Sequence, residues 1–176
     1  MAATPPTERI WWKEPIAKTE LAWIFIALLW GLVMFFMMIY WHGRGNQNLS
    51  NEAYRTTPQA FQAKAQEMVD QFQIGEEAGI PIVRPPAGSD VYLIARLWQW
   101  WPILEFEKGE TYRLHLSSMD WQHGFSLQPV NLNLQVHPNY DLVATITPTQ
   151  TGEFGVVCNE FCGIGHHMMI GKIYVK

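Results

Sequence analysis

The chain has 176 residues, of which 48% are apolar, 14% aromatic and only 16% charged, a composition that argues against intrinsic disorder. Its length suits one domain with a small addition, and its two cysteines are too few for a disulfide scaffold. The 12 Lys and Arg against 16 Asp and Glu give a net charge of −4, which disfavours a nucleic-acid partner because such proteins carry a basic face.

The first predicted element is a membrane-spanning helix over residues 21–41, preceded by an N-terminal segment 1–20. Residues 21–41 contain no charged side chain, and at 1.5 Å per residue they span about 31 Å, close to the thickness of the bilayer core. Trp23 near one end and Trp41 at the other match the aromatic belts of membrane interfaces. A buried core helix rarely runs so long without a polar face, and no small-residue cleavage site follows, as a signal peptide would require. We therefore predict one retained transmembrane helix in a lipid bilayer.

Positive charges near this helix give a weak indication of its orientation. Arg9, Lys13 and Lys18 precede the helix, whereas Arg44 and Arg55 follow it. By the positive-inside rule, three against two weakly favours an N-terminus in the cytoplasm, with the bulk of the chain on the outer side of the membrane.

Residues 42–89 are predicted as a linker that contains one short amphipathic helix. Thr57 and Pro58 suit an N-cap and a first helical residue. Apolar residues then recur at spacings of three and four through residues 58–73, which favours a helix that packs on a neighbouring surface or lies on the membrane. Residues 75–89 contain three prolines and two further glycines after Gly75, and are interpreted as a connector to the next domain.

Residues 90–176 change from a helical period to a period of two. Apolar and other side chains alternate along residues 112–117, 131–136 and 142–146, and turn-forming clusters separate these runs. Short strands at this spacing indicate an antiparallel sandwich or barrel. The fold class is therefore mainly β, with one N-terminal transmembrane helix.

Both cysteines lie in one glycine-rich dodecapeptide, Cys158 to Met169, which also contains two histidines and two methionines. A disulfide between Cys158 and Cys162 would leave those other side chains unexplained. Zinc would accept two cysteines and two histidines, but thioether sulfur is a soft ligand that suits copper better. A mononuclear blue copper site needs only one cysteine. Two thiolates can each bridge two metals, so a two-copper cluster employs both.

A second histidine is needed for such a cluster, because His166 serves only one of the two ions. The candidates elsewhere are His115, His123, His137 and His167. His123 is best placed, since it lies in a loop after a strand and Gly124 allows a close backbone approach. We expect His115 and His137 to be exposed to solvent. His167 would point to the opposite side from His166 in an extended chain, so we expect it to be exposed or to support the ligands from outside the cluster.

These residues identify a family resemblance over residues 90–176. The pattern Cys-x-Glu-x-Cys-x3-His-x2-Met, with an upstream Asp-x-x-His-Gly-Phe, resembles the copper-A domain of subunit II of heme–copper terminal oxidases. The resemblance implies a cupredoxin-like Greek-key β-barrel that holds two copper ions. The implied metal ligands are His123, Cys158, Glu160 through its backbone carbonyl, Cys162, His166 and Met169. Met169 is preferred to Met168 by the family pattern alone, and a magnesium ion near Glu160, as in some relatives, stays open.

The resemblance also implies a function. The chain would be the subunit through which electrons pass from cytochrome c to the heme centres of subunit I, where oxygen is reduced to water. Trp100, in a Gln-Trp stretch, matches the family position at which electrons enter. Residues 90–176 carry 5 Lys and Arg against 8 Asp and Glu, a mild acidity that would steer a basic cytochrome.

Other readings of the same ligands remain. One is the copper-A subunit of a nitric oxide reductase, and another is a membrane-tethered copper chaperone. With a single predicted transmembrane helix, the chain is similar to subunit II of the B-type oxidases, which is short and crosses the membrane once. The expected location is a bacterial or archaeal plasma membrane, with the copper domain on its outer, periplasmic side.

Overall fold

The computed structural model describes residues 15–44, 51–130 and 132–176, and contacts divide the chain into two units, 1–47 and 48–176. In the first unit, α1 is a helix over Lys18–Arg44. It contains the predicted span 21–41 and extends it by three residues at each end. Among the described residues, it is the one helix long and apolar enough to cross a membrane. The prediction of a single apolar N-terminal helix is therefore confirmed.

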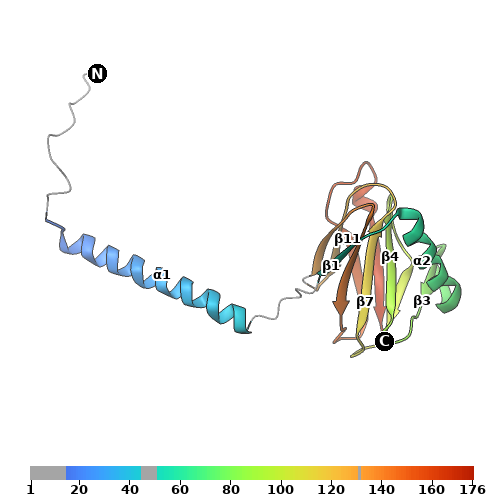
Figure 1. Cartoon of the computed structure of the whole chain (residues 1–176), viewed down its shortest axis with the longest axis horizontal. Helices are drawn as coiled ribbons and strands as arrows, with labels where there is room; N and C mark the ends of the chain where they lie inside the picture. The colour runs from blue at the N-terminus through green and yellow to red at the C-terminus, as the bar shows by residue number, and fades with distance from the viewer. Residues whose placement is uncertain (1–14, 45–50, 131) are drawn as a thin grey trace, which may run out of the picture. The chain divides into compact units, whose positions relative to one another are not determined.

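The second unit consists mainly of two β-sheets with one helix beside them (Figure 1). The first sheet has the strand order β1-β10-β7-β4-β5, and the second has the order β2-β3-β6-β12-β11-β8-β9. The elements are β1 (Asn51–Arg55), α2 (Pro58–Phe72), β2 (Gln73–Glu77), β3 (Ile80–Val83), β4 (Asp90–Arg96), β5 (Gln99–Trp101), β6 (Ile103–Phe106), β7 (Tyr112–Ser118), β8 (His123–Gln128), β9 (Leu132–Val136), β10 (Tyr140–Ile146), β11 (Gly152–Cys158), the 3₁₀ turn η2 (His166–Met168) and β12 (Ile170–Val175).

The mainly β prediction is confirmed, but the sheets are mixed where we expected antiparallel pairing throughout. β4 pairs with β7, and β6 pairs with β3 and β12, in the parallel direction. The chain crosses from β5 in the first sheet to β6 in the second before it returns to β7, and such a crossover makes parallel neighbours possible. The alternating pattern of side chains does not report strand direction.

Residues 51–83 belong to the second unit, where the sequence predicted a linker over 42–89. β1 pairs with β10 over five residues, and β2 and β3 form a hairpin. The hairpin turn consists of Ala78 and Gly79, whose φ angles of 51° and 80° are both positive, as in the tight turns that join twisted strands. Pro81 lies in β3 and pairs with Glu76. The prolines and glycines of this segment thus shape a hairpin and its exit, whereas we interpreted them as marks of an irregular connector.

The helix predicted over residues 58–73 is confirmed as α2. The hydroxyl of Thr57 accepts a hydrogen bond from the amide of Ala60, and Pro58 occupies the first turn. Its buried face packs on β4 and the neighbouring strands. Phe61 lies edge-on against Tyr92 of β4, with ring centroids 5.5 Å apart. Between packing on a neighbouring surface and lying on the membrane, the structure supports the first.

The main core lies between the two sheets. Its fully buried side chains come from strands of both sheets and include Leu93, Leu104, Phe106, Leu114, Leu116, Phe125 and Ile173. Cys158, Cys162 and Met169 belong to the same cluster, so the metal-binding side chains predicted from sequence are part of the packed interior. A rigid core of this kind holds side chains in fixed rotamers.

Candidate metal centre

The loop from Cys158 to Met169 joins β11 to β12 and is closed at its base. The backbone amide of Cys158 donates to the carbonyl of Met169 over 3.1 Å, which places the first and last residues of the loop side by side. Within the loop, the amide of His166 donates to the carbonyl of Gly163 over 3.1 Å, and η2 follows. The loop therefore folds back on itself and brings the side chains of Cys158, Cys162, His166 and Met169 together.

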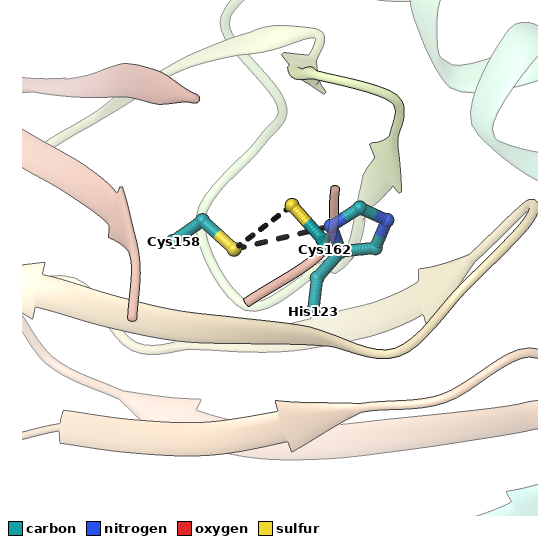
Figure 2. Close-up of side chains that lie close together, drawn as sticks. All are labelled: His123, Cys158 and Cys162. Carbon is teal, nitrogen blue, oxygen red and sulfur yellow. Dashed lines mark hydrogen bonds between the residues drawn. The ribbon is translucent and has the colours of Figure 1, made fainter. Parts of the chain in front are cut away.

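The sulfur and nitrogen atoms at this centre form two similar halves. The Sγ atoms of Cys158 and Cys162 lie 3.7 Å apart. His123 presents Nδ1 to Cys158 Sγ at 3.9 Å, and His166 presents Nδ1 to Cys162 Sγ at 3.7 Å. Figure 2 shows the side chains of Cys158 and Cys162, which belong to one loop, close to the side chain of His123. In the described part of the chain, these three form the only group of three or more His, Cys, Asp or Glu ligands close enough to hold one metal ion.

Each half has one further donor. The thiol of Cys158 donates to the backbone carbonyl oxygen of Glu160 over 3.2 Å, and Met169 Sδ lies 3.8 Å from Cys162 Sγ. The structure thus brings together five of the predicted side chains and the carbonyl group of the sixth residue. The neighbouring Met168 is 62% exposed, whereas Met169 is fully buried, which separates the two methionines where spacing could not.

The separations are compatible with shared metal ions. With metal–sulfur and metal–nitrogen bonds of about 2.3 and 2.1 Å, as for zinc, a sulfur and a nitrogen on one ion lie at most about 4.4 Å apart. Both sulfur–histidine pairs fall inside this bound. The two thiols, two imidazoles and one thioether form a soft donor set, which suits copper. The residues present therefore fit the two-copper group that the sequence predicted.

Burial affects the protonation of Cys162 in the metal-free chain. Burial, with the neighbouring Cys158, raises the pKa of the Cys162 thiol to about 11. The metal-free chain consequently keeps this proton at neutral pH, and metal binding has to release it, because the thiolate is the ligand.

His123 is oriented by Asp120, the first residue of the Asp-x-x-His-Gly-Phe motif. Its ring is completely buried, and its Nε2 donates to Asp120 Oδ1 over 2.7 Å. Burial raises the pKa of the Asp120 carboxyl, but hydrogen bonds from His123 and from the amides of Trp121 and Leu97 outweigh it, so the pKa lies below the ordinary value. Asp120 is therefore a carboxylate at neutral pH.

The other candidate histidines, His115, His137 and His167, are not among the gathered ligands, and the expectation for His115 was wrong. His115 is 6% exposed, not solvent-exposed, because its Nδ1 bonds the Asp141 carboxylate at 2.9 Å and the ring of Tyr92 covers it. The alternation of side chains placed His115 on the polar face of its strand, but that face is itself covered. His137 is half-buried, and His167 is exposed, as we expected for the latter.

Trp100 is buried, whereas a residue that receives electrons by direct contact with a partner protein must reach the surface. It is only 3% exposed and packs edge-on against His123 and Phe125. The assignment of Trp100 is therefore wrong for direct contact with a donor, since a donor protein meets only the surface. Its neighbour two residues earlier, Trp98, is 37% exposed and lies against the metal loop.

Trp98 covers the loop closely enough to require glycine beneath it. Its indole Nε1 donates to the carbonyl of Cys162 over 3.4 Å. A Cβ atom on Gly165 would lie only 2.1 Å from the indole Cδ2, and one on Gly163 would lie 3.6 Å from Nε1. The sequence offered three neighbouring tryptophans, and only the chain path distinguishes the one that reaches both solvent and the loop.

Large apolar side chains are exposed around the same loop. Phe161 is 81% exposed, Ile164 90% and Met168 62%, and all three belong to the loop itself. Trp121, next to Asp120, is 63% exposed. We call Trp98, Trp121, Phe161, Ile164 and Met168 the apolar face. Exposed apolar residues gathered beside a functional site mark an interaction surface.

The side chain of Glu160 is directed to a neighbour on β9. Its Oε1 accepts a hydrogen bond from Gln135 Nε2 over 3.1 Å. The described residues gather no second cluster of three His, Cys, Asp or Glu ligands at Glu160.

No known family model matches the chain, but individual relatives do. The cytochrome c oxidase subunit 2 of Thermus thermophilus is 33% identical over 92 residues, which are 52% of this chain and 68% of the relative. The alternative cytochrome c oxidase subunit 2 of Bradyrhizobium diazoefficiens is 31% identical over 68 residues, which are 39% of this chain and 24% of the relative.

Solved structures agree with these relatives. A chain of a heme-copper terminal oxidase dimer matches with a TM-score of 0.58 and 25% identity. The match covers 90% of this chain and 100% of that chain. The copper protein rusticyanin matches with a TM-score of 0.50 and 19% identity, covering 71% of this chain and 98% of its own. This second likeness shows the fold alone and supports the predicted cupredoxin-like architecture.

Proposed function

This chain belongs to the cytochrome c oxidase subunit 2 family, and we propose that it takes electrons from cytochrome c at a binuclear copper-A centre. As the electron-accepting subunit of the oxidase, it works with subunit I, where oxygen is reduced to water. The relatives do not favour the alternatives of a nitric oxide reductase or a copper chaperone. The chain is anchored to the membrane by α1.

One observation supports two copper ions rather than one. The two buried sulfurs lie 3.7 Å apart, and each has its own histidine, His123 beside Cys158 and His166 beside Cys162. A mononuclear site would leave one cysteine and its partner without a role. When bound, two copper ions that share both thiolates supply a centre that gains and loses one electron.

The protein keeps the metal-binding atoms in fixed positions and shields them from water. Cys158 and Cys162 are 4% and 6% exposed, and Met169 is fully buried, so water has little access to the sulfurs. The loop ends are fixed by the bond between Cys158 and Met169, and His123 is held at the start of β8. Ligands that barely move favour fast electron transfer, because little rearrangement accompanies it.

Copper uptake tests the proposal. The full chain, purified metal-free in detergent and titrated with a copper salt under reducing conditions, is expected to retain two copper atoms per chain. Retention of one atom, or of none, would contradict the binuclear centre.

The apolar face supports a docking site for the donor protein that depends little on charge. Two charged side chains near it are already engaged, Asp120 with His123 and Glu160 with Gln135. Arg96, at the end of β4, bonds Gln99 and lies over the ring of Trp101. Hydrogen bonds do not neutralise these carboxylates, but Asp120 and Glu160 are only two of the eight acidic residues of 90–176, so the mild acidity of this region is not concentrated where the donor would meet the loop.

Salt dependence of donor oxidation distinguishes apolar docking from electrostatic steering. We expect the second-order rate of cytochrome c oxidation by the assembled oxidase to change by less than about threefold between 20 and 200 mM salt, because steered reactions change by factors of 10 or more. Replacing Phe161 with serine should slow the reaction at both salt concentrations. A steep fall with salt in the unaltered complex would favour steering instead.

Trp98 is the residue that we propose as the point where electrons enter, in place of Trp100. Its indole combines an exposed edge with a hydrogen bond to the carbonyl of Cys162, so it joins the donor surface to a metal ligand. We expect Trp98→Ala to slow electron transfer from cytochrome c by at least about tenfold, measured by stopped-flow reduction of the copper-loaded chain. Trp121→Ala, a change of the same size on the apolar face, is the control. Equal slowing in both variants would indicate lost docking area instead of a lost electron path.

The expected location is the plasma membrane of a bacterium or archaeon, with the copper unit outside. The distribution of basic residues around α1 supports this orientation weakly. Protease digestion of intact spheroplasts should remove the copper unit if it lies outside, and should leave it intact if it faces the cytoplasm.

A further inference from the structure

Asp120 lies in the turn between β7 and β8, and its two carboxylate oxygens bond different parts of the site. Oδ1 accepts from His123 Nε2 over 2.7 Å and from the amide of Trp121 over 2.6 Å. Oδ2 accepts from the amide of Leu97 over 2.7 Å. Leu97 and Trp98 form the turn between β4 and β5, because Arg96 pairs with Gln99. One side chain thus connects a metal ligand to the turn that carries Trp98.

The hydrogen bond between Asp120 and His123 fixes the tautomer of the His123 ring, and so decides which ring nitrogen has a free lone pair. A carboxylate only accepts hydrogen bonds, so Nε2 of the neutral ring must carry the proton. Nδ1, which lies 3.9 Å from Cys158 Sγ, is then free to act as a metal ligand. Carboxylates that bond the outer nitrogen of a ligating histidine typically raise metal affinity 10–100-fold.

The bond to Leu97 reaches the other half of the site. The residue after Leu97 is Trp98, whose indole N–H donates to the carbonyl of Cys162 and whose ring lies over Gly165. Holding the amide of Leu97 holds the turn from which this indole projects. The chain of contacts therefore runs from His123 through Asp120 to Trp98 and Cys162.

We propose that Asp120 is a positioning residue that joins the two halves of the copper site, orienting His123 on one side and keeping Trp98 over the metal loop on the other. This inference rests on the proposed copper centre. Asparagine at this position has a single acceptor oxygen, so it can serve His123 or Leu97 but turns an N–H group toward the other donor. Asp120→Asn therefore breaks one of the two connections at nearly constant size.

A matched control exists in the same unit. Asp141 bonds Nδ1 of the buried His115 at 2.9 Å, so it is also a carboxylate–histidine pair, but His115 is not among the gathered metal ligands. Asp141→Asn makes the same chemical change away from the sulfurs. Circular dichroism of both variants would check folding, and Asp120→Glu, which keeps the charge but moves it, would replace an Asn variant that did not fold.

The first measurement uses the metal-free full chain in detergent. Nitrogen-15 NMR of the imidazole rings is expected to show His123 protonated at Nε2 in the unaltered chain and in Asp141→Asn. In Asp120→Asn, a mixture of His123 tautomers is expected if the new N–H group faces His123, and a shifted indole N–H resonance of Trp98 if it faces Leu97. Unchanged resonances of both His123 and Trp98 in Asp120→Asn would overturn the proposal. This result does not depend on copper, so it is separate from any failure of the two-copper proposal.

The second measurement is copper affinity, determined by competition with a chelator. Asp120→Asn is expected to weaken binding by about 10–100-fold, and Asp141→Asn by less than about twofold. Trp98→Phe keeps a ring over the loop but loses the N–H group. If Asp120 acts on both halves, the double variant Asp120→Asn, Trp98→Phe loses less copper affinity than the product of the fold-losses in the two single variants. Fully independent effects would overturn the connection to Trp98, and equal affinity losses in the two Asn variants would overturn the positioning role.

Discussion

Replacing Cys162 with serine is expected to abolish the two-copper centre. Cys162 Sγ has three partners in the site, at 3.7 Å from Cys158 Sγ, 3.7 Å from His166 Nδ1 and 3.8 Å from Met169 Sδ. A serine hydroxyl stays protonated and is a hard ligand, so it cannot bridge two copper ions. Since changes in supporting residues alone weaken metal binding 10–100-fold, we expect a loss greater than about 100-fold for one ion. Copper content after dialysis should fall from two atoms per chain to one or fewer.

Met168→Leu is the control for this experiment. Met168 lies on the same loop, but it is 62% exposed, and the methionine beside Cys162 Sγ is Met169. We expect it to retain both copper atoms. If Cys162→Ser retained two copper atoms and its electron paramagnetic resonance spectrum did not change, the ligand assignment would be wrong.

Replacing Gly124 with alanine is expected to displace Asn159 and Glu160 of the metal loop and to destabilise the fold. An added Cβ would lie 2.0 Å from Asn159 Oδ1 and 2.8 Å from the backbone nitrogen of Glu160. The side chain of Asn159 can rotate, but the backbone of Glu160 cannot yield without moving the carbonyl that faces Cys158. Overpacking costs about 1–3 kcal/mol, and we expect the upper end of this range in the free energy of unfolding. Chemical denaturation of the metal-free chain measures it.

Gly155→Ala tests whether the effect belongs to the position. Gly155 lies in β11, and no atom stands within 4 Å of its would-be Cβ. Its substitution should change the free energy of unfolding by no more than about 0.5 kcal/mol. Similar destabilisation in both variants would mean that the close approach of β8 to the loop is not important for stability.

Several elements were predictable because one physical property decided them locally. The uncharged run of residues 21–41 predicted α1, and the capping pair Thr57 and Pro58 with its apolar spacing predicted α2 almost to the residue. The alternation of residues 112–117 predicted β7. Caps, periodicity and length act within a few residues, so they are visible without the rest of the chain.

Other features depend on partners far along the chain, and the sequence alone misread them. β2 and β3 were assigned to a linker, because their prolines and glycines give no sign of the sheet edge that β6 provides. His115 was expected in solvent, although Asp141 and Tyr92 from other strands bury it.

The site shows the same division between local and distant information. The loop from Cys158 to Met169 is contiguous, so its donor atoms could be named from their chemistry. The roles of Asp120 and Trp98 could not, because both depend on contact between the β4–β5 and β7–β8 turns. Trp100 stands in the expected dipeptide, yet the path of β5 buries it.

Electron paramagnetic resonance of the oxidised, copper-loaded chain tests the central claim most directly. If two thiolates hold both ions equivalently, the unpaired electron is shared, and its spectrum shows the multi-line hyperfine pattern of two coupled copper nuclei. A four-line spectrum, as one isolated copper ion gives, would contradict the account.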